Sequence, residues 1–252
     1  MSYKKSKYFT ISRKRRIKYF FLNKNSGICV VYFHGFMSDM IGKKPTTIQN
    51  VCKKQKVNFL RFEYSGHGKS TGKFVEGNIS KWTNEAKKLI KNKTKKKQKL
   101  IFIGSSMGSW IALNLFSHFK KQLKAFIGIA SAPDFLENLM WKKFNKKIKN
   151  QIETQKIFHF KHGEFVYPLT KQLFLDGKKN KILNNKINLK ILLILFHGTK
   201  DKSVPINVSK KIFKICNKSK KKLIKIKNGS HSLSRKQDLK KICSELSNII
   251  RG

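Results

Sequence analysis

Short apolar runs alternate with longer amphipathic stretches along most of this chain. Runs such as residues 100–103 are β-branched or aromatic and only a few residues long, which is typical of buried strands. Stretches such as residues 107–119 place apolar residues three and four positions apart, which predicts helices with one apolar face. Because strands and helices alternate, we expect an α/β fold with a mostly parallel central sheet and helices on both faces.

The pattern gives boundaries for each element. The predicted strands cover residues 16–22, 28–33, 57–62, 100–103, 125–130, 189–196 and 223–226. The predicted helices cover residues 45–56, 79–92, 107–119, 205–216 and 235–250. Residues 134–188 break the alternation, and we predict an irregular insertion there. A chain of 252 residues is the usual size for one such domain, so we expect a single domain over residues 1–252.

One junction between a predicted strand and helix carries candidate chemistry. The chain reads Gly104-Ser105-Ser106-Met107-Gly108, which has the spacing G-x-S-x-G. Glycines suit a sharp strand-to-helix turn because a Cβ at either position would clash with the neighbouring elements. Ser106 stands at the tip and is the candidate nucleophile, whereas Ser105 points elsewhere. The same spacing also occurs in ordinary tight turns, so a nucleophilic role requires a base and an orienting acid elsewhere in the chain.

Carboxylates are scarce, since the chain has only 12 Asp and Glu residues. Asp201 lies in the turn that follows the apolar run at residues 191–196, and α/β folds assemble their sites after such strands. We therefore expect Asp201 to be the acid. A second interpretation makes it a cap for the following helix. Asp134, after the strand at residues 125–130, is the alternative acid.

Of the seven histidines, only His231 follows Asp201 in the chain. It lies in the loop between the predicted strand at residues 223–226 and the last helix. A single loop histidine is usually a solvated surface residue. The order Ser106, Asp201, His231, each after a predicted strand, is much more specific and predicts a Ser-Asp-His triad.

Five colinear stretches between Tyr32 and Arg235 resemble the α/β hydrolases. They read YFHGFMSDMIGKK, FLRFEYSGHGKSTGKF, LIFIGSSMGSWIALN, LFHGTKDKSVP and NGSHSLSR. The chain most resembles the mitochondrial palmitoyl-protein thioesterases that also cleave acyl glucuronides, with their bacterial relatives. This resemblance implies an α/β-hydrolase fold with a small lid insertion at about residues 134–188. It also implies an oxyanion hole made by the backbone amides of Phe36 and Met107, no metal and no organic cofactor.

The same resemblance suggests the reaction, the hydrolysis of acyl thioesters or esters, with acylated protein among the substrates. A small-ester carboxylesterase is the alternative enzyme, and a non-catalytic hydrolase scaffold that binds anionic partners is the competing class. Two residues depart from the family pattern. Glu63 replaces an aspartate and affects only local packing, and Ser109 replaces a glycine, which favours a tighter turn at Ser106. We expect His67 to be structural.

Aromatic and other apolar residues are frequent in the predicted insertion. They form either an apolar roof over Ser106 or the ordinary core of a few short helices. These residues are Phe135, Leu136, Leu139, Met140, Trp141, Phe144, Phe158, Phe160 and Phe165.

The formal net charge of +46 suggests binding to anionic polymers. The excess is nearly all lysine, spread over most of the predicted helices and loops, and specific recognition of bases favours arginine. We therefore expect non-specific association with anionic polymers or membrane surfaces and no specific nucleic-acid partner. A compositional bias toward lysine, asparagine, isoleucine and phenylalanine explains the charge without a function.

The cysteines and the N-terminal residues bear on location. Cys29, Cys52, Cys216 and Cys243 have neither C-x-x-C nor metal-ligand spacing, which favours a reducing compartment. The first sixteen residues contain no apolar signal core, and no run of about 18 apolar residues occurs. We predict a cytoplasmic location, with the mitochondrial matrix as the alternative because the N-terminal residues are basic and lack acids.

Overall fold

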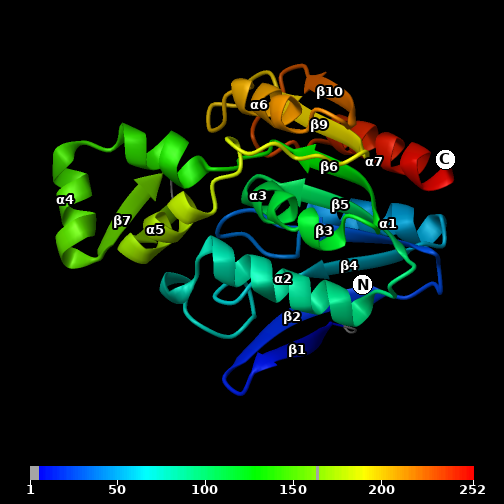
Figure 1. Cartoon of the computed structure of the whole chain (residues 1–252), viewed down its shortest axis with the longest axis horizontal. Helices are drawn as coiled ribbons and strands as arrows, with labels where there is room; N and C mark the ends of the chain where they lie inside the picture. The colour runs from blue at the N-terminus through cyan, green and yellow to red at the C-terminus, as the bar shows by residue number, and fades with distance from the viewer. Residues whose placement is uncertain (1–5, 163–164) are drawn as a thin grey trace.

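The computed structural model describes residues 6–162 and 165–252, and its centre is an eight-stranded sheet (Figure 1). β1 pairs antiparallel with β2 and β2 antiparallel with β4, whereas every other neighbouring pair is parallel. The mostly parallel sheet is therefore confirmed. In spatial order the strands are β1 (Lys7–Ser12), β2 (Arg15–Leu22), β4 (Asn58–Phe62), β3 (Ile28–Phe33), β5 (Lys99–Ser105), β6 (Leu123–Ile129), β9 (Leu192–Gly198) and β10 (Lys220–Ile226).

The central strands are buried on both faces, which explains their continuous apolar runs. On β5, Leu100 and Phe102 belong to one hydrophobic cluster, while Ile101 and Ile103 belong to another on the opposite face. All four side chains are fully buried. A strand has a side-chain period of two, so each face of the sheet needs its own layer of helices.

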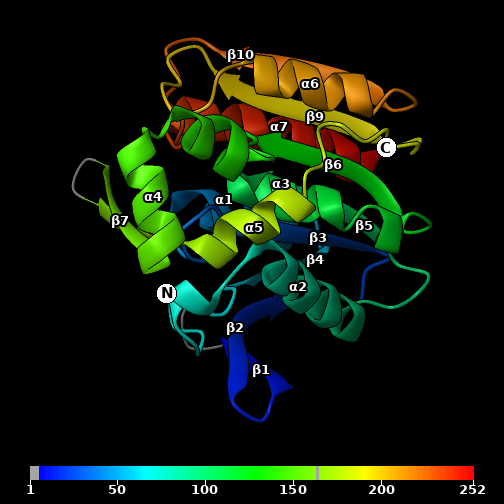
Figure 2. The same ribbon diagram turned by 60° about the vertical axis from the view of Figure 1, so that its left-hand side comes forward.

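Helices cover both faces as predicted (Figures 1 and 2). The cluster that contains Phe102 includes side chains from α2, α3 and α6, and the opposite cluster includes side chains from α1 and α7. These helices are α1 (Lys43–Lys54), α2 (Ile79–Lys93), α3 (Met107–Asn114), α6 (Asn207–Ile215) and α7 (Lys236–Arg251).

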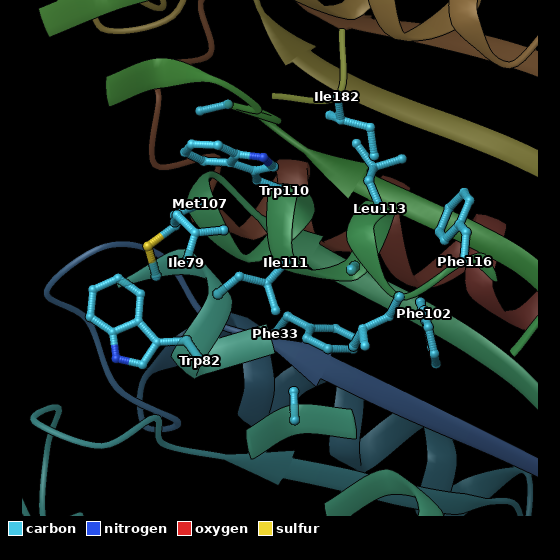
Figure 3. Packing of buried hydrophobic residues seen from close by; sticks show 14 of the residues in the cluster. Phe33, Ile79, Trp82, Phe102, Met107, Trp110, Ile111, Leu113, Phe116 and Ile182 are labelled. Atoms are coloured by element: carbon cyan, nitrogen blue, oxygen red, sulfur yellow. The ribbon is translucent and has the colours of Figure 1, made fainter. Parts of the chain in front are cut away.

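α3 is buried all round rather than on one face. Every residue from Met107 to Leu113 is buried. Ile111 lies on the sheet side near Phe33, whereas Trp110 lies on the other side, toward Ile182 (Figure 3). The indole N–H of Trp110 donates to the Asn180 carbonyl at 2.9 Å. The insertion thus covers the outer side of α3. The predicted helix at residues 107–119 was too long, because α3 ends at Asn114 and a 3₁₀ turn, Ser117–Phe119, follows.

The insertion between β6 and β9 is regular, so the prediction of an irregular segment was wrong. A π-helical turn (Leu136–Met140) and a 3₁₀ turn (Trp141–Lys143) come first. An antiparallel hairpin follows between two helices, and Figure 1 shows this region beside the sheet. These elements are α4 (Lys146–Gln155), β7 (Ile157–His162), β8 (Phe165–Thr170) and α5 (Lys171–Lys179).

Two strands mark the edges of the sheet. β1 was not predicted; most of its side chains are exposed or half-buried, so it lacks a continuous apolar run. β10 lies at the opposite edge and begins with three exposed lysines, Lys220, Lys221 and Lys222. A short 3₁₀ turn, Phe74–Glu76, precedes α2. Among the described residues, no helix combines the length and apolar character needed to cross a membrane.

Candidate active site

The turn that carries Ser106 is strained in the way the glycine spacing predicted. Ser106 has φ 52° and ψ −119°, in the left-handed region that side chains other than glycine avoid. A Cβ on Gly104 would lie 2.5 Å from Ser109 Cα, and one on Gly108 would lie 2.2 Å from the Phe33 carbonyl oxygen. Both positions therefore require glycine, and the close packing holds Ser106 at the carboxyl end of β5.

The three predicted triad residues come together at this edge of the sheet. Ser106 Oγ lies 3.0 Å from His231 Nε2, and His231 Nδ1 lies 2.8 Å from Asp201 Oδ2. Asp201 follows β9 and His231 follows β10, so three parallel strands deliver the three side chains. Since a carboxylate only accepts, Nδ1 carries the proton, and Nε2 accepts from the Ser106 hydroxyl.

Asp201 faces His231 and holds its own turn, but it does not cap the following helix, because α6 begins at Asn207 and its N-cap, Ile206, has no side-chain hydrogen bond. Asp201 Oδ1 accepts the backbone N–H groups of Ser203 and Val204, both at 2.9 Å, while Oδ2 faces His231. Burial acts to raise the pKa of Asp201, but the hydrogen bonds from His231 and the two amides together hold it below its ordinary value. The carboxylate is therefore ionised at neutral pH. His197 lies 3.8 Å from Oδ2 and is fixed by Ser209 Oγ and the Val204 carbonyl.

Asp134, the alternative acid, is engaged elsewhere. Its two carboxylate oxygens accept the backbone N–H groups of Ile182 at 2.9 Å and Leu183 at 3.0 Å. These bonds join the two ends of the insertion. Burial raises the pKa of Asp134 despite both bonds. The structure thus brings His231 to Asp201 and gives Asp134 a place at the base of the insertion.

The backbone beside Ser106 has the form expected of an oxyanion site. A Cβ on Gly35 would lie 3.5 Å from both Ser105 O and Ser106 Cβ, so the loop after β3 packs against the strand-to-helix turn. Within the described part of the chain, the amides of Phe36 and Met107 have no hydrogen-bond acceptor. Met107 is the first residue of α3, where backbone N–H groups have no partner within the helix.

His34 holds this loop, and the sequence analysis did not identify it. Its Nδ1–H donates to the Gly35 carbonyl at 2.8 Å, and Nε2 accepts the Tyr64 amide at 3.4 Å. Burial and the nearby His67 keep the pKa of His34 well below its ordinary value, so the ring is neutral. A histidine directly before the Gly35-Phe36 pair, after a buried strand, was the available signal.

The two departures from the family pattern have local roles. Ser109 Oγ donates to the Gly104 carbonyl at 2.8 Å and accepts from Ser131 Oγ at 2.9 Å, so the extra hydroxyl links the turn to the loop after β6. Glu63 is buried and accepts the Lys69 amide at 2.7 Å. His67 is buried among aromatic rings, which fits the structural role expected for it.

Apolar side chains surround Phe36 beside Ser106. Its ring centroid lies 5.3 Å from that of Phe135 and 5.9 Å from that of Tyr167, which it stacks on. Met37 and Val166 are 41% and 50% exposed. Only some of the residues that were predicted as a possible apolar roof over Ser106 lie beside the Ser106 turn. Leu136 and Phe144 are buried in the core, Phe158 and Phe160 pack against Phe144, and the side chain of Phe165 lies outside the described residues.

In the part of the chain that the structure describes, no three His, Cys, Asp or Glu side chains form a cluster suited to a metal ion.

Proteins of similar sequence and similar fold are known. Residues 25–163 match a family model described as serine aminopeptidase, S33. Palmitoyl-protein thioesterase ABHD10, mitochondrial, from Bos taurus is 26% identical over 227 residues, which are 88% of this chain and 72% of that protein. A putative hydrolase from Agrobacterium vitis S4 superposes with a TM-score of 0.92 and 27% identity over 98% of both chains. The mouse α/β hydrolase domain-containing protein 10 superposes with a TM-score of 0.87 and 22% identity, also over 98% of both. The predicted resemblance is thereby confirmed, and this chain is a hydrolase that belongs to the α/β-hydrolase family of the serine aminopeptidase S33 type.

Proposed function

We propose that this chain hydrolyses acyl thioesters or esters with Ser106 as nucleophile, His231 as general base and acid, and Asp201 as the group that orients His231. One observation carries the proposal. Ser106 Oγ, the two nitrogens of His231 and Asp201 Oδ2 form one continuous line of hydrogen bonds, 3.0 and 2.8 Å long. A serine hydroxyl needs such a base, and the base needs such an orienting group.

The first half-reaction forms an acyl-enzyme. Ser106 Oγ attacks the acyl carbonyl carbon while His231 Nε2 takes the hydroxyl proton. The resulting imidazolium is stabilised by the Asp201 carboxylate. When the tetrahedral intermediate collapses, the bond to the leaving sulfur or oxygen breaks and Nε2 returns the proton to it. Water then attacks the Ser106 ester by the same route and releases the carboxylic acid and the free enzyme.

The amides of Phe36 and Met107 serve as the oxyanion hole in this proposal. Charge develops on the carbonyl oxygen only as the tetrahedral intermediate forms, so donors fixed beforehand stabilise the transition state more than the substrate. The close approach of Gly35 to Ser106 and the helix start at Met107 support this assignment.

The apolar surroundings favour substrates with an acyl chain. Phe36, Phe135 and Tyr167 form an aromatic group beside the Ser106 turn, and Met37 and Val166 are exposed apolar side chains of the same loop and strand. The bovine relative is named a palmitoyl-protein thioesterase. We propose acyl thioesters, acylated protein among them, as the substrate class. A small-ester carboxylesterase is the second candidate, and a scaffold without catalysis requires that the aligned triad has no activity.

Four variants test the assignment together. Ser106→Ala should lower kcat on p-nitrophenyl esters at least about 10³-fold, whereas Ser105→Ala should keep most of it, because only the tip residue faces His231. Asp201→Asn should lower kcat about 10⁴-fold, because an amide in place of the carboxylate favours the wrong tautomer of His231, as in serine protease triads. Asp134→Asn should lower thermal stability rather than kcat, because it weakens the base of the insertion.

Covalent labelling provides the independent readout. A fluorophosphonate probe should label the wild-type protein and the Ser105→Ala variant but not Ser106→Ala. Equal loss of labelling in both folded serine variants, or a larger loss of turnover in Asp134→Asn than in Asp201→Asn, would overturn the assignment.

Two further proposals concern surroundings rather than chemistry. We propose that the high positive charge leads to non-specific association with anionic polymers or membrane surfaces, without a specific nucleic-acid partner. We also keep the predicted cytoplasmic location; the name of the bovine relative, which includes the word mitochondrial, supports the matrix alternative.

A further inference from the structure

Lys44, on the first turn of α1, reaches the loop that carries His231. Its ammonium group donates to the Ser232 carbonyl at 2.5 Å and to Ser234 Oγ at 3.1 Å. These acceptors lie one and three residues after His231, although Lys44 is distant in sequence. α1 and α7 pack on the same face of the sheet, so the contact joins the helix layer to the histidine loop.

Lys44 is only partly exposed to solvent. Burial lowers the pKa of Lys44 to about 8, while the nearby Asp238 carboxylate acts to raise it. Asp238 is already paired with Arg235, whose Nη2 lies 2.8 Å from Oδ1. The ammonium group therefore loses hydration without gaining a carboxylate of its own.

The loop between β10 and α7 contains strained backbone, which contacts from other elements, such as that of Lys44, stabilise. Asn228 and Leu233 both have positive φ values, 56° and 45°, which side chains other than glycine adopt at a cost. The buried side chain of Leu233 anchors the loop on one side of His231. Lys44 holds the loop on both sides of Leu233, through the carbonyl of Ser232, directly after His231, and through Ser234 Oγ.

We propose that Lys44 is a positioning residue that fixes the His231 loop so that Nε2 faces Ser106 Oγ. This inference rests on the proposed function, since it assigns Lys44 a role in the reaction of Ser106. The His231 ring lies between two partners, and a shift of about 1 Å in such a geometry costs up to about 10²-fold in rate. Lys44 acts through backbone and hydroxyl acceptors and does not touch the substrate.

Three variants separate positioning from general stability. Lys44→Met removes the donors and keeps the length of the side chain, whereas Lys44→Arg keeps the positive charge. Lys43→Met is the matched control, because Lys43 is exposed on the same helical turn. With a p-nitrophenyl ester, Lys44→Met should lower kcat about tenfold with little change in KM. Lys44→Arg should recover part of kcat because it keeps a charged donor.

Lys44→Met should change thermal stability differently from turnover. The pKa of Lys44 is lower in the folded than in the unfolded state. Between pH 8 and the ordinary lysine pKa, the folded protein therefore binds fewer protons than the unfolded chain. Below pH 8 both states carry the charged ammonium group, and its burial destabilises the folded protein. The melting temperature of Lys44→Met at pH 7 should therefore equal or exceed that of the wild type. A kcat equal to that of Lys43→Met, or a fall in kcat accompanied by a fall in melting temperature, would overturn the inference.

A readout without turnover distinguishes this inference from the proposed function. The Nδ1 proton of His231 gives a downfield NMR signal when it is held against Asp201. In a Ser106→Ala background, Lys44→Met should shift or broaden this signal and Lys43→Met should not. An inactive wild-type protein with this NMR response contradicts the proposed function alone, whereas an active protein without the response contradicts the role of Lys44.

Discussion

Among the individual side chains, two buried histidines organise the loops behind Ser106. The rings of His34 and His67 lie 5.1 Å apart, and Trp82 and Phe74 pack against His67 at 4.9 and 5.1 Å. Burial lowers the pKa of His67 to about 4, and the pKa of His34 is lowered as well. Both rings are neutral in the folded protein, so the loop that carries Phe36 depends on histidines that do not become charged.

This pair predicts an acid-sensitive fold. Between pH 6.5 and about 4 the unfolded chain protonates His67 and the folded chain does not, so the free energy of unfolding falls as the pH falls. For one such histidine the loss between pH 7 and pH 5 is about 2 kcal/mol. His67→Phe should reduce by this amount the difference between the free energies of unfolding that urea denaturation gives at these two pH values.

An exposed histidine provides the control for this measurement. His159 lies exposed on β7, and His159→Phe should leave the pH dependence of the urea midpoint unchanged. The same pH dependence in wild type and His67→Phe would show that His67 is not held neutral in the folded state.

Among the secondary-structure elements, the insertion is tied to the main body at several places. The Asp176 carboxylate on α5 accepts the Ser80 amide of α2 at 2.9 Å, and Gln172 donates to the Val75 carbonyl at 2.8 Å. Asp134 closes the base of the insertion. These bonds hold β8 in place, so that Tyr167 stacks on Phe36 beside Ser106.

The aromatic contact predicts a preference for longer acyl chains. Each buried methylene contributes about 0.8 kcal/mol, so kcat/KM should rise several-fold for each added pair of carbons from acetyl to at least octanoyl. Tyr167→Ala should flatten this rise because it removes the ring on Phe36. The control is Leu175→Ala on α5, where the side chain is 51% exposed. A flat acyl series, or one that falls after acetyl, would favour the small-ester carboxylesterase.

The elements that the sequence predicted well are those whose burial is regular. β3 was predicted with its observed bounds, and β5 with its apolar centre, since both are buried on two faces. β1 and the β7–β8 hairpin were missed because few of their side chains are buried, so their pairing leaves a weak pattern.

The functional site likewise has residues that the sequence predicted and residues that it did not. The chain order and the strand-to-turn positions were enough to predict that Ser106, Asp201 and His231 would meet. The contacts of His34 with Tyr64 and of Lys44 with Ser232 join residues far apart in sequence through backbone groups. Every residue has a backbone carbonyl, so a hydrogen bond to a backbone acceptor requires no particular residue type and leaves no pattern in the sequence. The sequence therefore predicted the site residues whose side chains contact one another. It did not predict the residues that position loops through backbone contacts.

For the molecule as a whole, positive charge is the dominant surface property. The net charge is +46, with lysines on α1, α2, α4, α5, α6 and α7 and none on the buried α3. Such a distribution has no single face that reads a sequence of bases, and it attracts any polyanion through release of counterions.

The charge predicts the salt dependence of nucleic-acid binding. Affinity for a single-stranded oligonucleotide should fall at least about tenfold between roughly 50 and 200 mM salt. Two oligonucleotides of equal length and unrelated sequence should bind equally well in fluorescence anisotropy. A tight complex with one of them at physiological salt would instead support the scaffold that binds anionic partners.

The lysines of β10 also govern how copies of this protein can meet. An edge strand offers its backbone to a neighbouring chain, and a second copy that paired there would bring Lys220 and Lys221 against the same ammonium groups. This repulsion disfavours growth of the sheet from molecule to molecule. Chemical neutralisation of lysine amines, as in acylation or carbamylation, would remove the barrier. Aggregation after such modification would then begin at β10.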